Sequence, residues 1–85
     1  MSAYELAQDA MAKLRSSVYL QLLDAGTEGL KNSELGRSLG IYSGHAGHEG
    51  HISRTILALM EAEGVVEQIG ETKAWRLRGV EAVST

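Results

Sequence analysis

Three histidines stand at a regular spacing near the middle of the chain, and their side chains are the most chemically distinctive in the sequence. His45, His48 and His51 each follow a glycine, within residues 43–53, SGHAGHEGHIS. Three imidazoles and a water can complete the tetrahedral shell of a zinc ion. The glycines make such a site costly to order, and the chain has no cysteine to act as a fourth ligand. We therefore expect no metal or other cofactor, with these three histidines as the alternative metal-binding set.

Two further uses of this segment stay open. Glycine-rich backbone can present successive amides to an anion, and imidazole N–H groups can donate to phosphate oxygens. Alternatively, the segment is a lengthened surface loop with solvated histidines. Catalysis is not expected, because Ser43 and Ser53 lack a rigid scaffold and an orienting carboxylate. The segment also lacks the Lys-Ser/Thr ending of a phosphate-binding loop, so we expect no enzyme.

The bulk composition indicates one small domain. The chain has 85 residues, 44% of them apolar, and a formal net charge of −3. We expect one folded unit over 1–79 and a flexible tail over 80–85. The first residues lack the basic and apolar pattern of a signal peptide, and no run is long enough for a membrane helix. With no cysteines, the composition favours the cytoplasm.

The longest predicted element is a helix over about 3–25. Ser2 and Glu5 have the spacing of a capping box, and Gly26 is a typical stop. Because this helix is long for so small a domain, we expect its first turns to project, where they could pack on a second copy in a homodimer. The expected inward stripe is Leu6, Ala10, Leu14, Val18 and Leu22, widened by Met11 and Leu23.

The rest of the chain predicts two shorter helices and a hairpin. The second helix is expected over about 32–39, the histidine and glycine loop over 40–50, and the third helix over about 51–63. In the third helix we expect Ile52, Ile56 and Leu59 to face inward, with Met60 beside them. Apolar and polar residues alternate within 65–78, which predicts a two-stranded hairpin around Gly70. The expected fold class is α+β, mostly α.

These elements resemble the winged helix-turn-helix family. Residues 29–41, GLKNSELGRSLGI, are similar to its second helix. Residues 51–68, HISRTILALMEAEGVVEQ, are similar to its recognition helix running into the first strand of the wing. Residues 73–79, KAWRLRG, are similar to the returning strand. The resemblance covers about 18–79, and the histidine triplets fall in a connection longer than the three or four residues usual in the family.

The resemblance implies a sequence-specific protein that binds double-stranded DNA, as a transcriptional regulator. The amino end of the third helix would enter the major groove, and the wing would contact the backbone. On the third helix the expected outward residues include Leu57, and Lys31 and the amides of the second helix would bind a phosphate. The implied DNA contacts are Asn32, Ser33, His48, His51, Ser53, Arg54, Lys73, Arg76 and Arg78.

A second function stays open beside DNA binding. Winged helices also serve as protein–protein interaction or targeting modules of larger assemblies, such as restriction or polymerase complexes. The acidic residues Glu61, Glu63 and Glu67 favour this alternative, whereas the basic strand over 73–78 favours DNA. A positive surface over the third helix and the wing would support DNA as the partner.

Overall fold

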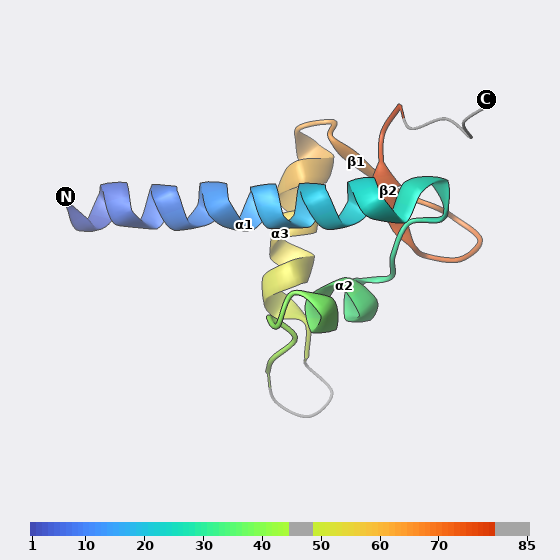
Figure 1. Cartoon of the computed structure of the whole chain (residues 1–85), viewed down its shortest axis with the longest axis horizontal. Coiled ribbons are helices and arrows are strands. Elements are labelled where there is room, and N and C mark those ends of the chain that lie inside the picture. Colours follow the sequence, from blue (N-terminus) through green and yellow to red (C-terminus); the bar gives the residue numbers. More distant parts are fainter. Residues whose placement is uncertain (45–48, 80–85) are drawn as a thin grey trace.

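The structure is a computed structural model that describes residues 1–44 and 49–79, a mostly helical chain with an antiparallel hairpin (Figure 1). This confirms the α+β, mostly α class. The predictions for His45, His48 and the tail over 80–85 lie outside the described residues. The elements are α1 (Ala3–Ala25), the 3-10 helix η1 (Gly26–Glu28), α2 (Asn32–Ser38), α3 (His51–Ala62), β1 (Val66–Gln68) and β2 (Trp75–Leu77).

Helix α1 begins at the predicted capping box. The backbone N–H of Ser2 donates to Glu5 Oε1 over 2.9 Å, and the backbone N–H of Glu5 donates to Ser2 Oγ over 3.1 Å. Hydrogen bonds from the backbone and the side chain of Ser2 lower the pKa of the Glu5 carboxyl. The helix ends at Gly26, whose φ of 67° is easily reached by glycine.

The two halves of α1 differ in burial. Val18 and Leu22 are fully buried, and Met11 and Leu14 pack partly against the core. Residues 1–10 are all exposed, and Figure 1 shows this end of α1 extending past the other elements, so the first turns project as expected. The predicted inward stripe is therefore wrong at its ends, where Leu6, Ala10 and Leu23 are exposed.

Helix α3 is rotated relative to the sequence prediction. Its buried residues are Ser53, Ile56, Leu57 and Met60, whereas Ile52 and Leu59 are 41% and 36% exposed. Both stripes have helical spacing and share Ile56, so periodicity alone could not separate them. The observed face is set by contacts with α1 and α2, and the Ser53 hydroxyl finds a local acceptor that makes its burial tolerable.

The hairpin gains a third short segment from the connection between η1 and α2. Val66 pairs with Leu77 and Glu67 with Arg76 in the hairpin. On the other edge of β2, Leu30 and Trp75 exchange two backbone hydrogen bonds of 2.9 and 2.7 Å. Gly29 permits this approach, because a Cβ there would meet the Trp75 carbonyl oxygen. The segment before α2 is thereby tied to the sheet.

The rotation of α3 predicts how two neighbouring leucines differ. Leu57→Ala removes a fully buried side chain and should lower the free energy of unfolding by about 2–5 kcal/mol. Leu59→Ala acts on a side chain that is 36% exposed and should cost less than about 1 kcal/mol. Urea unfolding followed by circular dichroism measures both. Equal losses, or a larger loss for Leu59→Ala, would contradict the observed orientation.

Candidate functional site

The amino end of α3 is held by one backbone carbonyl. Gly50 precedes the helix with a φ of 83° and is buried. Its carbonyl oxygen accepts hydrogen bonds from the backbone N–H of Arg54 at 3.0 Å and from Ser53 Oγ and Asn32 Nδ2 at 3.3 Å each. Because Asn32 belongs to α2, this carbonyl couples the two helices.

The same residue closes the connection between α2 and α3. The backbone N–H of Gly50 donates to the carbonyl of Ser43 over 3.0 Å, so the two ends of the long connection meet. Ser43 and Gly50 form the neck of this connection. Tyr42 packs beside the neck, since a Cβ on Gly36 or Gly50 would lie 3.0 Å from its ring. The Arg37 guanidinium lies over the Tyr42 ring, 4.6 Å from the ring centroid. The two ends of the connection thus hold α2 and α3 together despite its length.

Two predicted DNA contacts belong to this neck. Ser53 and Leu57 were both expected to face outward. The exposed fraction of each is 0%, so both predicted orientations are wrong. Asn32 donates its amide to Gly50, and its Oδ1 is buried without a hydrogen-bond partner among the described residues. These side chains shape the start of α3 rather than an outer surface.

The amino end of α2 already holds a carboxylate. Glu34 Oε1 accepts a hydrogen bond from the backbone N–H of Lys31 over 2.8 Å, and Lys31 is the cap residue. A carboxylate at a helix amino end interacts favourably with the helix dipole, as a phosphate would, and it repels a phosphate brought beside it. Ser33 is half-buried at this position. The contacts of Asn32 and Ser33 with a phosphate stay predictions.

The exposed side of α3 is nearly uncharged. Arg54 is exposed as predicted, and its guanidinium NH2 donates to the carbonyl of Glu49 over 3.3 Å. His51 is also exposed. Within α3, which is described throughout, Arg54 and Glu61 are the exposed residues with formal charge. The complete exposed set is His51, Ile52, Arg54, Thr55, Ala58, Leu59, Glu61 and Ala62.

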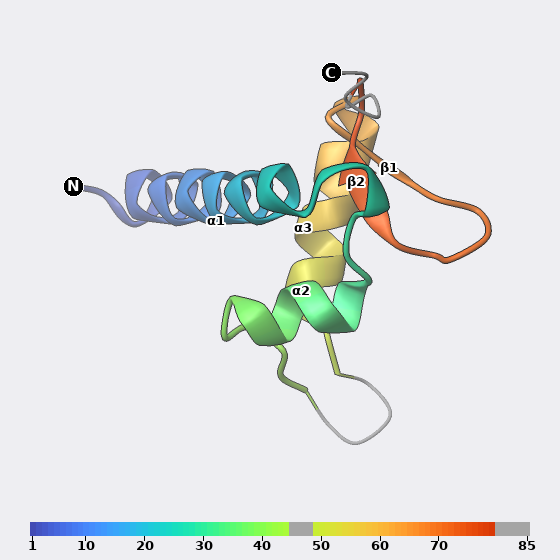
Figure 2. The ribbon, with the colours of Figure 1, turned by 45° about the vertical axis from the view of Figure 1, so that its right-hand side comes forward.

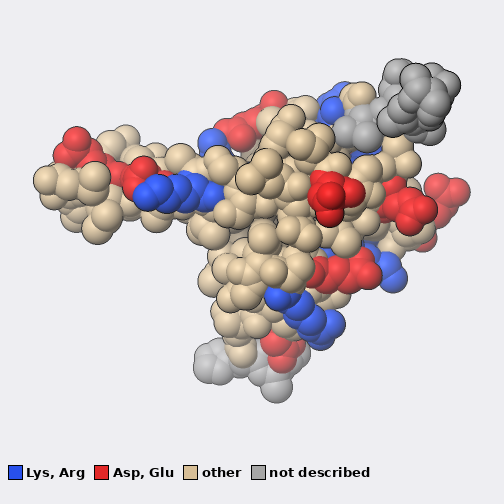
Figure 3. Space-filling model, viewed as in Figure 1, with Lys and Arg blue, Asp and Glu red and all other residues tan. Residues whose placement is uncertain are grey.

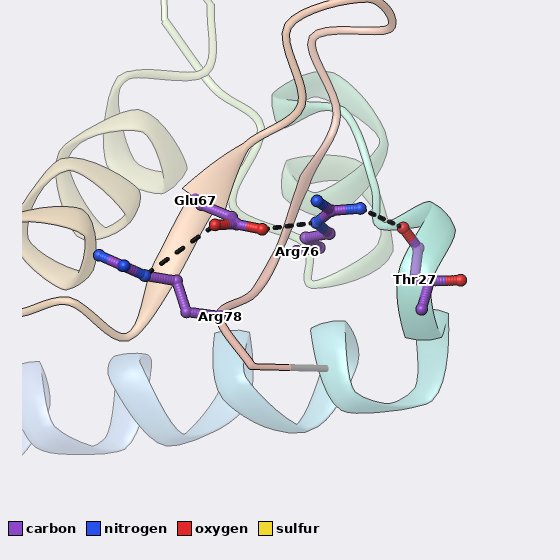
Figure 4. A network of polar contacts seen from close by, with 4 residues as sticks. All are labelled: Thr27, Glu67, Arg76 and Arg78. Carbon is purple, nitrogen blue, oxygen red and sulfur yellow. Dashed lines mark hydrogen bonds and ion pairs between the residues drawn. The ribbon is translucent and has the colours of Figure 1, made fainter. Parts of the chain in front are cut away.

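The arginines of the hairpin are engaged by an acid. Arg76 Nε lies 2.7 Å from Glu67 Oε2, and its NH1 donates to the carbonyl of Thr27 over 3.4 Å (Figure 4). Arg78 Nε lies 3.9 Å from the other oxygen of Glu67. Arg76 is half-buried and turned toward η1, so its guanidinium is already engaged within the protein. Cross-strand pairing of Glu67 with Arg76 was the sequence signal that could have revealed this.

The predicted contacts separate into two groups. Lys73 is exposed near the hairpin tip, with a φ of 66°, and the Arg78 side chain is 60% exposed. His51 and Arg54 lie at the amino end of α3. Figures 1 and 2 show the hairpin tip and this end of α3 leaving the body of the molecule in different directions. The hairpin tip and the first turn of α3 are therefore separate parts of the surface.

The described residues hold no cluster of three or more His, Cys, Asp or Glu suited to a metal ion. Two members of the alternative metal set, His45 and His48, fall outside the described ranges. The histidine metal site and the DNA contact of His48 therefore stay predictions.

Two clefts flank the crossing of α1 and α3, and neither was predicted from the sequence. Figure 3 shows mainly uncharged side chains where the two helices cross. The larger cleft, of about 520 Å³, is spanned by a 2.7 Å ion pair between Arg15 and Glu63. Its other lining residues are Ser16, Tyr19, Leu20, Met60 and Val65. The smaller cleft, of about 240 Å³, is lined by Met11, Leu14, His51, Ile52, Thr55 and Ile56.

Comparison of the chain with protein-family models, curated protein sequences and solved structures gave no match. Among the described residues, no helix combines the length and apolar character needed to cross a bilayer.

The neck at Gly50 predicts a difference between two glycines with nearly the same positive φ. Gly64→Ala places a side chain at a φ of 78° with no neighbouring atom within 4 Å, and backbone strain should cost about 1–3 kcal/mol. Gly50→Ala adds a contact of 2.6 Å with Asn32 Nδ2, so it should cost a further 1–3 kcal/mol or so. Chemical denaturation measures the two losses. A neutral Gly50→Ala would show that the neck does not constrain α3.

Proposed function

We propose that this chain is a winged-helix domain that binds double-stranded DNA and acts in transcription regulation. The order of α1, the Leu30 bridge, α2, α3 and the hairpin supports the winged-helix assignment. The observation that carries the DNA proposal is the exposed first half of α3, with Arg54 and Thr55 facing outward from a start that Gly50 holds in place. A rigid helix end can present side chains to base edges.

The proposed interface is smaller than the one implied by the resemblance. Arg54 would read a guanine or hold a phosphate, with His51 and Thr55 beside it on the same side of α3. Lys73 and Arg78 would contact the phosphate backbone. Lys73 and Arg78 on two phosphates correspond to a salt dependence of log K with a slope near −1.8, which becomes about −2.7 when Arg54 holds a third phosphate, using about −0.9 per phosphate.

Arg76 has a different role in this proposal. Its contacts with Glu67 and Thr27 tie the hairpin to η1. Its removal should alter the position of the hairpin rather than delete a phosphate contact.

A second candidate function is a protein–protein interaction module. The nearly uncharged side of α3 and the net charge of −3 support it. Tyr19, Leu20 and Leu23 also support it, because they are 43%, 63% and 53% exposed on the part of α1 beside the larger cleft. Exposed apolar side chains grouped around a cleft are typical of a docking surface.

The DNA proposal predicts distinct effects for two arginines. Duplexes would first be selected from a randomised pool with the parent chain, and affinities measured by fluorescence anisotropy at several salt concentrations. Arg54→Ala should weaken binding to the selected sequence by about 1–3 kcal/mol and relax its base preference. Arg78→Ala should weaken binding to all duplexes similarly and reduce the salt slope by about one unit.

Lys13→Ala is the matched control for these variants, because it removes one exposed positive charge from α1, away from α3 and the hairpin. It should leave affinity nearly unchanged. If the parent binds no mixed-sequence duplex at low salt, or if all three variants bind equally well, the DNA proposal fails and the interaction module is favoured.

A further inference from the structure

The projecting end of α1 continues the stripe by which this helix packs on the core. Tyr4, Ala7, Met11, Leu14 and Val18 follow the alternating three- and four-residue spacing of a heptad seam. Val18 is fully buried and Leu14 and Met11 are partly buried. Ala7 is exposed, and Tyr4 is 73% exposed. One face of the helix is thus covered at one end and bare at the other.

Charge is segregated from this stripe. The charged residues in the first half of α1 are Glu5, Asp9 and Lys13, spaced four residues apart, which places them together on the face opposite Tyr4 and Met11. Asp9 and Lys13 form an ion pair of 3.0 Å there. The bare stripe therefore carries no ion that a partner would have to desolvate.

A groove with the same character lies beside the bare stripe. Met11 and Leu14 form one wall of the smaller cleft, and Ile52 and Thr55 of α3 line the other. Ile52 is 41% exposed, a large fraction for isoleucine beside a cleft. The cleft, of about 240 Å³, is lined mainly by apolar side chains, which suits the ring of an aromatic residue.

We propose that two copies of this chain associate through antiparallel α1 helices, each inserting Tyr4 into the smaller cleft of the other. A second copy is the occupant that the surface itself specifies, because a convex apolar stripe and an apolar groove adjoin each other on one molecule. A two-fold axis turns such a surface into a self-complementary contact. Charged partners such as DNA or an anionic membrane find no matching cations on this stripe.

The register follows from the spacing. In an antiparallel pair, facing residues have numbers with a constant sum, and a sum of 15 sets Tyr4 opposite Met11 of the partner subunit. The axis then passes between Ala7 and Gln8, where the small alanine side chain permits close approach of the two backbones. Met11 also lines the smaller cleft, so this register directs Tyr4 toward that cleft of the partner subunit. This proposal is independent of the DNA proposal, and either can fail alone.

Sedimentation equilibrium of the full chain without DNA tests the association. The parent should sediment as a dimer at about 100 µM, and Tyr4→Glu should weaken the dimer at least about 100-fold. Glutamate is favourable in the first turn of a helix, so this variant keeps α1 intact, which circular dichroism verifies. Leu20→Glu is the control: it introduces the same charge at a residue that is 63% exposed on another face of α1, and the dimer should persist.

Disulfide trapping tests the register, because the natural chain contains no cysteine. Ala7→Cys should form a covalent dimer on mild oxidation, since residues beside the axis can meet the required Cα separation of about 4.4–6.8 Å. Ser16→Cys, exposed on another face of α1, should not. A monomeric parent overturns the proposal, and so does equal trapping of the two variants. Equal weakening by Tyr4→Glu and Leu20→Glu overturns it as well.

Discussion

The arrangement of the two central helices depends on the carbonyl group of Gly50. It accepts hydrogen bonds from the Arg54 backbone, the Ser53 hydroxyl and the Asn32 amide, and thereby joins the first turn of α3 to α2. The left-handed backbone of Gly50 and the Cβ contacts that a larger residue would make there explain why glycine occupies the position. The backbone N–H of Gly50 also donates to the carbonyl of Ser43, which brings the two ends of the long connection together.

Packing of α3 against α1 and α2, which the Gly50 carbonyl helps to hold in place, sets the side of α3 that faces the solvent. With Ser53 turned inward, Leu57 and Met60 enter the core, and Ile52 and Leu59 emerge on the flank. The residues left outside are small or apolar apart from Arg54, His51 and Glu61. The surface of α3 therefore differs from the strongly basic surface usual in DNA-binding helices, which is why a protein partner remains a serious second candidate.

Ion pairing on the hairpin also reduces the positive charge that is available to a nucleic acid. Glu67 lies opposite Arg76 in the register and also approaches Arg78, so part of the positive charge expected on this strand is neutralised within the protein. The cations that remain exposed there are few, and any binding of nucleic acid would depend on the details of α3 more than on a broad positive field. Mainly uncharged surface lies where α1 crosses α3 (Figure 3).

Local residue patterns were sufficient to predict the kinds and approximate extents of the elements. The capping box of Ser2 and Glu5 and the stop at Gly26 are local interactions, so their residue types and spacing were sufficient to predict them. Tertiary structure decided the face of α3 and the partner of Arg76. The stripes through Ile52 and through Ser53 were both possible for an isolated helix, and only packing against α1 and α2 distinguished them. The bond from Arg76 to Thr27 joins residues 49 positions apart, a separation that no local pattern encodes.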